Sequence, residues 1–530
     1  MSNKPKLSER FYYWLTGTKP NPNRKARRSY AAARVNNQNA NWGTQPTSAN
    51  WEQRMSQAAL RARSRQAARD NGIVTNFMRI MQSNVIGWKG IRLQCRASFG
   101  DGRLKTELNR SVEAAWKDWG HAETCTISGK LDWKRLQKLV LKHTLRDGEY
   151  LVQMIDDPMN PYGFSLKVWD VNWLDETFNT TQPNGNRVIM SVEVDANDKP
   201  VAYWLTTPAS DTNFVENRAR TRTRIPAEQM IHSGFLCDDE SQTRFVPWSH
   251  AGLLNLKNME GYEGGVIQSA RMAGNLFGFI EQDAIDGEEY TGQEGEDGTP
   301  STPVIDVSNL SVNLLNPGQR WNQMDPKQPT QNHSAFMKTE GMQTGAAFGI
   351  PYFLMFGDWE ATNYSSSRGG LGEAKQLWKD IQEFISETFC RRVYHEWLRR
   401  AWLAGKLNIT AANYNELQNP RWIGRGWEYI DPMKDVKADE IRLQNRLATP
   451  SEILAEQGID YTEFLDRWES DRKLAAAKGI DIDELYMPKN AVPEPANDPA
   501  NAPDAGDDGE DQPKDETKRE LLNGHAVLLN

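Results

Sequence analysis

The chain of 530 residues lacks the features of membrane-embedded and disulfide-rich proteins. No apolar stretch approaches the ~20 residues of a membrane-spanning helix. The first ten residues carry charges without the apolar segment of a signal peptide. The four cysteines are too widely spaced for CxxC metal sites or a disulfide framework: Cys95, Cys125, Cys237 and Cys390. These absences predict a soluble intracellular protein, of about three domains by length.

Common enzyme motifs are also missing. The sequence contains no G-x-x-x-x-G-K-[ST] phosphate-binding loop, no GxGxxG and no G-x-S-x-G. His395 and Glu396 begin like the zinc-binding H-E-x-x-H motif, but Arg399 occupies the second histidine position. His121 and Cys125 have the spacing of two metal ligands on a helix, but no second pair lies near them in the sequence. We therefore expect no catalytic residues, no cofactor and no metal.

One enzyme class remains as the alternative. A carbohydrate-active hydrolase uses two carboxylates beside the scissile bond, with tryptophans stacked on sugar rings, and this chain has 19 tryptophans. Its carboxylates, however, are spread out or lie in a glycine-rich segment. Trp116, Trp378 and Trp397 fall within predicted helices, where a role in the core is favoured over a sugar platform.

Positive and negative charges are unevenly distributed. Residues 1–70 contain fourteen Lys/Arg and three Asp/Glu, whereas residues 491–530 contain ten Asp/Glu and three Lys/Arg. The acidic end is also rich in Pro, Ala and Asn, so it cannot bury enough apolar surface to offset the entropy of ordering, and we expect disorder. The net charge of -8 argues against a protein that coats nucleic acid by bulk charge.

From Met272 to Gln319 the sequence contains no Lys or Arg and nine Asp/Glu, interleaved with glycines. This composition predicts an acidic, loop-rich excursion, with a short strand pair around 304–307 and 310–315. The spacing does not match the calcium-binding pattern D-x-[DN]-x-[DN]-G. A solvated insertion is the simpler interpretation.

Periodicity predicts an α+β first half and a helical second half. The first half has predicted helices at 51–83 (interrupted at Asn71-Gly72), 104–120 and 131–147, and predicted strands at 150–155, 164–171, 187–195 and 200–207. The second half has predicted helices at 249–281, 331–348 and 371–404, and three more within 433–486. The whole chain is therefore expected to be α+β and mainly helical.

Two glycine-containing segments of the second half carry further expectations. Glycines in the helix predicted at 249–281 would each cost about 1 kcal/mol relative to alanine, so we expect a neighbouring backbone to approach there. Residues 357–372 are predicted as a Gly/Ser loop. The end of this loop, Ser367 to Gly372, is compatible with phosphate binding at a helix N-terminus, but a flexible loop is an equally good interpretation.

Segments in a consistent order from about residue 60 to 487 resemble the portal proteins of tailed bacteriophages, in particular the lambda-like branch. No single segment is diagnostic; the match lies in their order and spacing. They include RDNGIVTNFMRIMQSNVIGWKGIRL, SVEAAWKDW, RDGEYLVQM, IHSGFLCDDESQTRFVPWSHAGL, LLNPGQRWNQMDPKQPTQNHSAFMKTEGMQTGAAFGIPYFLM, NYSSSRGGLGEAKQLW, WIGRGWEYIDPMKDVKADEIRL and LATPSEILAEQGIDYTEFLDRW.

The resemblance implies a non-enzymatic protein of the virion, assembled in the host cytoplasm into a ring of twelve subunits at one capsid vertex. Double-stranded DNA is packaged through the central channel by a separate terminase and later leaves by the same route. The implied partners are the terminase large subunit, the major capsid and scaffold proteins, and the head-completion or connector proteins; no membrane is implied.

The resemblance also implies a division into wing, stem, clip and crown. Its regions are a basic flexible arm (1–50), a wing (51–248), a stem helix (249–282), a clip (283–330), a second stem helix (331–350), a tunnel-loop region (351–372), a long wing helix with its return (373–432), a crown (433–488) and a disordered acidic tail (489–530).

Two groups of residues are the candidate site residues. The expected DNA-channel contacts in the tunnel loop are Asn363, Tyr364, Ser365, Ser366, Ser367 and Arg368. The expected partner-docking residues of the clip are Asp286, Glu288, Glu289, Glu294, Glu296 and Asp297. An acidic clip would repel phosphate, so DNA could slide through it, and it would steer a basic partner surface.

Overall fold

The computed structural model describes residues 46–101, 103–206, 222–274, 278–282, 293–294, 300–301, 319–323, 332–360, 364–427 and 432–480. The chain divides into two compact units, Met1–Asp460 and Tyr461–Asn530. Apart from residues 46–50, the predicted basic arm lies outside the described residues, as does the predicted acidic tail. No helix of the described ranges combines the length and apolarity needed to cross a membrane.

The first unit begins with two helices that share one capping residue. Helix α2 (Ala49–Asp70) is capped by Ser48, and α3 (Gly72–Met81) follows after a single residue, Asn71. The Asn71 Oδ1 accepts hydrogen bonds from the backbone N–H groups of Ile73 and Val74, at 2.9 and 3.0 Å. The predicted interruption at Asn71-Gly72 is confirmed, because the asparagine side chain satisfies the free donors of the new helix.

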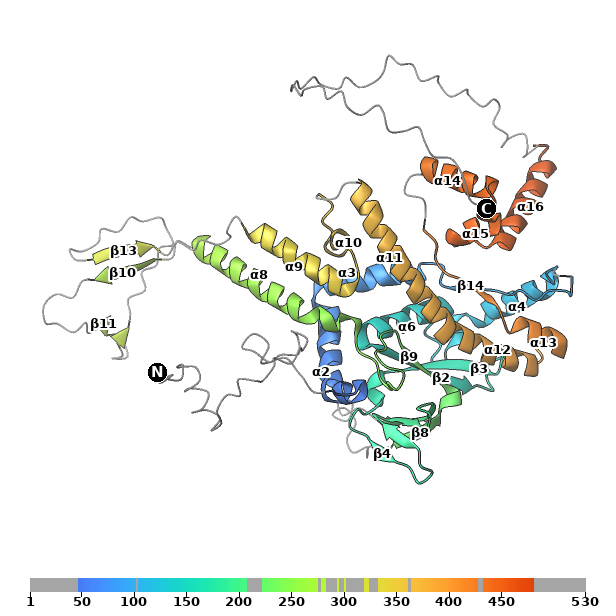
Figure 1. Cartoon of the computed structure of the whole chain (residues 1–530), viewed down its shortest axis with the longest axis horizontal. Coiled ribbons are helices and arrows are strands. Elements are labelled where there is room, and N and C mark those ends of the chain that lie inside the picture. Colours follow the sequence, from blue (N-terminus) through green and yellow to red (C-terminus); the bar gives the residue numbers. More distant parts are fainter. Residues whose placement is uncertain are drawn as a thin grey trace, which may run out of the picture. The chain divides into compact units, whose positions relative to one another are not determined.

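Three further helices lead to the sheets (Figure 1). They are α4 (Thr106–Trp119), the short α5 (Ala122–Cys125) and α6 (Trp133–Asp147). Gly120 ends α4 as predicted. Gly148 ends α6 in the left-handed conformation, with φ of 90°. A Cβ at Gly148 would lie 2.3 Å from the carbonyl carbon of Val246, so both the backbone conformation and the packing require glycine there.

Two antiparallel sheets follow α6. The three-stranded sheet has the order β3-β2-β9, with β2 (Glu149–Asp156) between β3 (Phe164–Trp169) and β9 (Met230–Gly234). The five-stranded sheet runs β4-β5-β6-β7-β8 in sequence order. Its strands are β4 (Thr180–Thr181), β5 (Arg187–Ile189), β6 (Val192–Val194), β7 (Pro200–Thr206) and β8 (Arg222–Pro226).

The single strand predicted at 187–195 is wrong, because this segment forms the hairpin β5–β6. The turn residues Met190 and Ser191 both have positive φ, 46° and 70°, as tight hairpin turns require. Neither is a glycine or asparagine, so the turn lacks its usual sequence signal. The Ser191 hydroxyl donates to the carbonyl of Asp175 at 2.9 Å and helps to hold this conformation.

A long helical run forms the centre of the second half. It comprises α11 (Tyr364–Ile385), a π-helical turn (Ser386–Cys390) and α12 (Arg391–Leu403). The helix predicted at 371–404 is confirmed, but it starts seven residues earlier. Trp116, Trp378 and Trp397 are all at least 95% buried, so none of them presents a sugar-stacking surface. Together with the two sheets, these helices confirm the prediction of a mainly helical α+β chain.

Shorter elements complete the chain. Helix α13 (Ala411–Leu417) precedes β14 (Arg421–Ile423), which pairs with β1 (Arg92–Gln94). Helices α14 (Pro432–Gln444) and α15 (Pro450–Glu456) close the first unit. The helix start predicted at Thr449 is confirmed by a capping box in which Thr449 and Glu452 exchange hydrogen bonds. The described part of the second unit contains α16 (Tyr461–Ala477).

Candidate functional site

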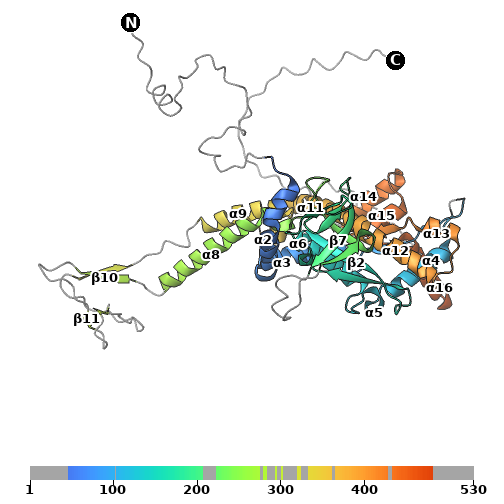
Figure 2. The same cartoon turned by 90° about the horizontal axis from the view of Figure 1, so that it is seen from below.

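Two antiparallel helices, α8 (Leu253–Gly274) and α9 (His333–Phe348), lie side by side in both views (Figures 1 and 2). The ring of Tyr262 stacks on His333, with centroids 5.5 Å apart, and meets Phe336 edge-on at 4.9 Å. Nearer the sheets, the Thr344 hydroxyl lies 3.6 Å from the sulfur of Met259. The contact is buried at Met259 and Thr344, whereas Phe336 at the aromatic end is 45% exposed.

The glycines of the two helices differ in what surrounds them. In α9, a Cβ at Gly345 would lie 2.9 Å from the carbonyl oxygen of Ile350, so close backbone approach requires this glycine. In α8, by contrast, a Cβ at Gly261, Gly264 or Gly265 would meet no atom within 4 Å. At these three glycines, the predicted close approach is therefore not made by any residue that the structure describes.

A strand ladder follows the helix pair. Strand β10 (Gly278–Gln282) pairs antiparallel with β13 (Gln319–Gln323). The predicted helix at 249–281 is thus too long: α8 ends at Gly274 and Ile280 lies in β10. In the sequence between β10 and β13, strand β11 (Gln293–Glu294) pairs with β12 (Pro300–Ser301). The strand pair predicted around 304–307 and 310–315 lies outside the described residues.

The structure describes only one of the six clip candidates. Glu294 lies in β11, opposite Pro300. The other five lie outside the described residues: Asp286, Glu288, Glu289, Glu296 and Asp297.

The tunnel-loop candidates lie at the start of a helix. The prediction of a loop over 357–372 is wrong for its second half, because α11 begins at Tyr364. The short helix α10 (Tyr352–Phe356) precedes this segment. Asn363 is outside the described residues, while Tyr364, Ser365, Ser366, Ser367 and Arg368 form the first turn and the beginning of the second. The glycines of the SRGGLG segment are likewise helical, so this segment does not form a phosphate-binding loop.

Arg368 connects the start of α11 to α14. Its guanidinium donates to the Asp435 carboxylate at 2.9 Å, and 48% of the Arg368 side chain is exposed. On the same helix, a Cβ at Gly370 would lie 3.1 Å from the ring of Phe353 in α10. Tertiary contacts of this kind stabilise a helix whose serines and glycines disfavour it intrinsically.

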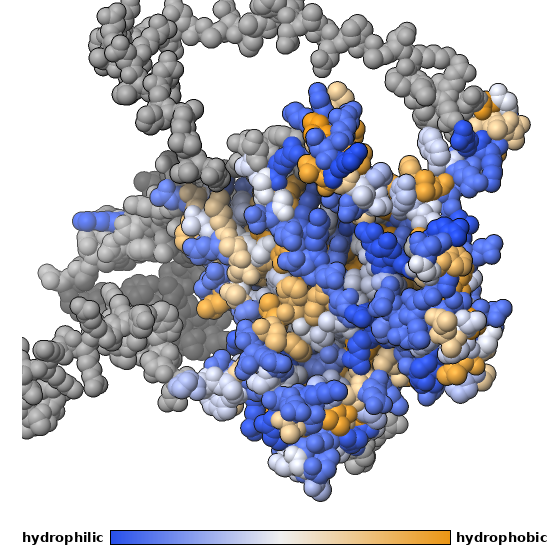
Figure 3. Space-filling model, turned by 45° about the vertical axis from the view of Figure 1, so that its right-hand side comes forward, coloured by the Kyte–Doolittle hydropathy of each residue, from blue (hydrophilic) through white to orange (hydrophobic). Residues whose placement is uncertain are grey.

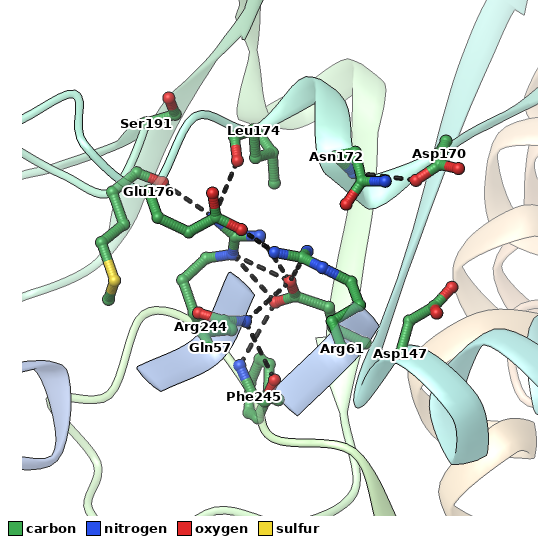
Figure 4. A network of polar contacts seen from close by, with 12 residues as sticks. Gln57, Arg61, Asp147, Asp170, Asn172, Leu174, Glu176, Ser191, Arg244 and Phe245 are labelled. Atoms are coloured by element: carbon green, nitrogen blue, oxygen red, sulfur yellow. Dashed lines mark hydrogen bonds and ion pairs between the residues drawn. The ribbon is translucent and has the colours of Figure 1, made fainter. Parts of the chain in front are cut away.

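A buried ionic network binds the segment that precedes α8 (Figure 4). Glu149, at the start of β2, is fully buried and accepts hydrogen bonds from Arg244, at 2.5 and 2.9 Å, and from Gln57 at 3.1 Å. Its other oxygen lies 3.0 Å from Nε2 of His232. Burial alone would raise the pKa of Glu149. The charge of Arg244 and the hydrogen bond with His232 have a larger, opposite effect, so the pKa lies well below its ordinary value.

A second buried arginine comes from α2. Arg61 is 2% exposed, lies 3.5 Å from Glu149 and also pairs with Glu176. Burial and the neighbouring charge of Arg244 lower the pKa of Arg61 to about 10. One turn later, Arg65 pairs with both Asp147 and Asp170, each at 2.7 Å.

The network holds the loop that leads into α8. Arg244 is followed by Phe245, whose backbone N–H donates to Glu149 at 3.2 Å. Further on, the hydroxyls of Ser249 and Ser64 are 2.9 Å apart. Helix α2 and strand β2 therefore fix the position of the chain just before the helix pair begins. Sequence reasoning missed this network; its one local signal is the helical spacing of the buried polar residues on α2: Gln53, Gln57, Arg61 and Ser64.

Candidate metal and catalytic pairs from the sequence have structural roles. Cys125 is buried, which raises the pKa of its thiol, whereas His121 is exposed. Glu396 binds Arg399 and Arg400, at 2.5 and 2.7 Å. Within the described ranges, no group of three or more His, Cys, Asp or Glu side chains is arranged to hold a metal ion.

Comparison with known proteins identifies the family. The family described as "Phage portal protein, lambda family" matches residues 35–382. A probable portal protein of Halomonas phage phiHAP-1 is 30% identical over 421 residues, covering 79% of this chain and 81% of the relative. Portal protein B of Escherichia phage lambda is 22% identical over 443 residues, covering 76% and 81%.

Among solved structures, a chain from the virion of a native gene transfer agent particle aligns with a TM-score of 0.39 and 13% identity, covering 77% of this chain and 99% of that chain. The family match covers well over half of the sequence and includes both α2 and the start of α11. This chain therefore belongs to the lambda family of phage portal proteins.

Proposed function

We propose that twelve copies of this chain form a ring at one capsid vertex, and that double-stranded DNA is packaged and ejected through its channel. In this proposal the terminase and the head-tail connector proteins dock on the ring. Membership of the portal family supports the proposal, and the number twelve follows the family resemblance. One structural observation carries it: Gly261, Gly264 and Gly265 of α8 have no neighbour within 4 Å among the residues that the structure describes.

The α8 glycines are costly in a lone chain. Gly261, Gly264 and Gly265 each cost a helix interior about 1 kcal/mol relative to alanine, and no atom of the described part of the chain occupies the space beside them. In a closed ring, one surface of each subunit contacts a different surface of its neighbour, and this contact repeats around the ring. A helix of the neighbouring copy would pack closely against these glycines and offset their cost.

The mass and shape of the purified full chain test the proposal. We expect a ring of about twelve times the 60.3 kDa of one chain, with a central channel visible by negative-stain electron microscopy. A strictly monomeric species without a channel would contradict it.

We further propose that the start of α11 contacts DNA in the channel. The candidates are those of the sequence: Asn363, Tyr364, Ser365, Ser366, Ser367 and Arg368. A half-exposed arginine beside serine hydroxyls can touch phosphates transiently without reading bases, which suits DNA that must slide.

The substitution Arg368→Glu is expected to reduce packaged DNA while changing the unfolding free energy by no more than about 1 kcal/mol, because the lost ion pair is partly exposed. Packaging is measured as nuclease-protected DNA in an assembly reaction. Asp435→Asn is the matched control, since it removes the same ion pair without placing a negative charge at position 368. Equal packaging by both variants and wild type would rule out this contact.

The acidic segment 283–330 is proposed as the docking clip, with Asp286, Glu288, Glu289, Glu294, Glu296 and Asp297 attracting a basic partner surface. Replacing these six residues by Lys is expected to slow association with the terminase large subunit, most strongly at low salt. The association rate constant at two salt concentrations is the measurement. An unchanged rate would exclude electrostatic steering by this segment.

A further inference from the structure

The solvent-facing side of α6 is basic throughout. Its outward positions include Lys134, Arg135, Lys138 and Lys142, all exposed or half-buried. The sole carboxylate of the helix, Asp147, is fully buried and bound to Arg65 and Arg146. The acid nearest to the start of the helix is the capping residue Asp132, whose carboxylate accepts a hydrogen bond from the backbone N–H of Arg135 at 2.7 Å. Between Trp133 and Arg146 this face therefore carries positive charge with no acid to balance it.

A second segment adds to this face. Residues 71–91 contain Arg79 and Lys89 but no acidic residue. The end of the segment lies along α6: the backbone N–H and carbonyl of Ile91 both bond to the side chain of Gln137, at 2.8 and 2.9 Å. A Cβ at Gly90 would lie 3.2 Å from Cγ of Lys134, so the backbone beside Lys89 runs along α6. The Lys89 ammonium lies over the ring of Trp88, 5.1 Å from its centroid. We call Lys89, Lys134, Arg135, Lys138 and Lys142 the α6 basic surface.

These five residues are grouped on one surface. Elsewhere on the helices, some exposed basic residues pair with acids one turn away, as in Arg391–Glu387 and Lys473–Glu469. Others, such as Lys117, are exposed and stand apart from further lysines on their helix. No residue of the α6 basic surface forms an ion pair with any residue that the structure describes. Instead, Lys134, Lys138 and Lys142 follow each other at four-residue spacing, an arrangement of like charges that destabilises a helix. An anionic ligand would relieve this repulsion.

We propose that the α6 basic surface binds the phosphate backbone of double-stranded DNA without sequence preference. The choice of DNA rests on the proposed function, in which the protein meets DNA during packaging. Duplex DNA carries one charge per about 1.7 Å of its axis, a dense array of phosphates for three lysines spaced about 6 Å apart along a helix. Lysines act as point charges toward phosphate and do not read base edges in this arrangement.

The chain's own acidic segment is a weaker candidate for the same surface. Residues 491–530 carry ten acidic side chains spread over forty residues and three basic ones among them. Their charge density is therefore far below that of DNA. With a net charge of -8, the protein as a whole repels DNA, so attraction is limited to its basic regions, which are this surface and residues 1–70. The lysine substitutions below leave residues 1–70 unchanged, so a loss of binding reports on the α6 basic surface.

The test compares the full chain with a triple variant, Lys134→Gln/Lys138→Gln/Lys142→Gln, in binding a fluorescently labelled duplex of about 30 base pairs across a series of salt concentrations. Each lysine that contacts a phosphate contributes about 1 to the slope of log K against log salt. We expect the triple variant to lose about 3 from this slope and at least about tenfold in affinity at 0.1 M salt.

The control variant, Lys117→Gln/Lys199→Gln/Lys406→Gln, removes three exposed lysines from other elements and is expected to bind DNA like the wild type. An unchanged slope in the α6 variant, or an equal loss in the control, would overturn the proposal. So would displacement of the duplex by a synthetic peptide of residues 491–530 at equal charge concentration. Particle mass is measured on the same samples, so a failure of ring assembly is distinguished from a failure of DNA binding.

Discussion

Replacing Glu149 by alanine is expected to lower the free energy of unfolding by about 3–5 kcal/mol, the usual effect of breaking a buried ion pair. The substitution leaves Arg61 and Arg244, 2% and 0% exposed, without the carboxylate that compensates their desolvation. The ordered loop before α8 would also lose the hydrogen bond from Phe245 to this carboxylate. The expected result is therefore loss of stability together with loss of ring assembly.

Urea denaturation of the full chain measures this effect. Glu416→Ala is the matched control, because its ion pair with Lys105 is partly exposed and should contribute no more than about 1 kcal/mol. Equal midpoints for the two variants would show that the network does not stabilise the fold. Because the pKa of Glu149 is lowered in the folded state, its contribution is complete above the ordinary glutamate pKa and is lost only as the pH falls through the lower folded value.

The second large effect is expected at Gly264 in α8. Alanine at this position fits the open space around the glycine and should stabilise the isolated chain by up to about 1 kcal/mol through helix propensity. Leucine should also be tolerated within one chain. In the ring, however, either side chain would occupy the space proposed for the neighbouring subunit, and leucine should prevent assembly.

Particle mass and thermal unfolding measured on the same variants separate the two effects. Gly369→Ala in α11 is the control, since its position is also helical and has no neighbouring atom within 4 Å. It should give a similar gain in stability while rings still form. Normal rings from Gly264→Leu would contradict close packing of subunits against α8.

Local signals predicted three helix boundaries correctly. Asn71, Gly120 and Thr449 act through atoms within four residues of themselves, so their effect is visible in a short window of sequence. The prediction for the first half of the chain rested largely on such signals and on apolar periodicity. The structure confirms helices at each of these three positions.

Non-local contacts explain what sequence reasoning missed. Glu149 and Arg244 are separated by 95 residues, and nothing near either residue indicates that it is buried. The segment from Tyr364 to Gly372 has the composition of a loop, but contacts such as Arg368 with Asp435 make it helical. The Met190-Ser191 turn also escaped prediction, because its positive φ values occur without glycine. In each case tertiary contacts outweigh local propensity.

For the same reason, the helices of the candidate site were predicted but the contacts of their glycines were not. Two helices at 249–281 and 331–348 were expected from the residue pattern, and α8 and α9 confirm them, with α8 ending earlier than predicted. Periodicity cannot show which glycines meet a neighbour. We predicted from the sequence that a backbone approaches the glycines of α8. Among the described residues, it is Gly345 of α9 that makes such a contact.

The buried face of α2 consists of four polar residues, Gln53, Gln57, Arg61 and Ser64. An apolar face would allow a helix to slide along its axis at modest cost, since hydrophobic contact has no preferred direction. Hydrogen bonds and ion pairs are directional, and a shift of one turn, about 5.4 Å, would break the contacts of Gln57 and Arg61 with Glu149 together. Helix α2 therefore has a single register against β2. The position of Ser48, the residue that caps the start of α2, is fixed as a result.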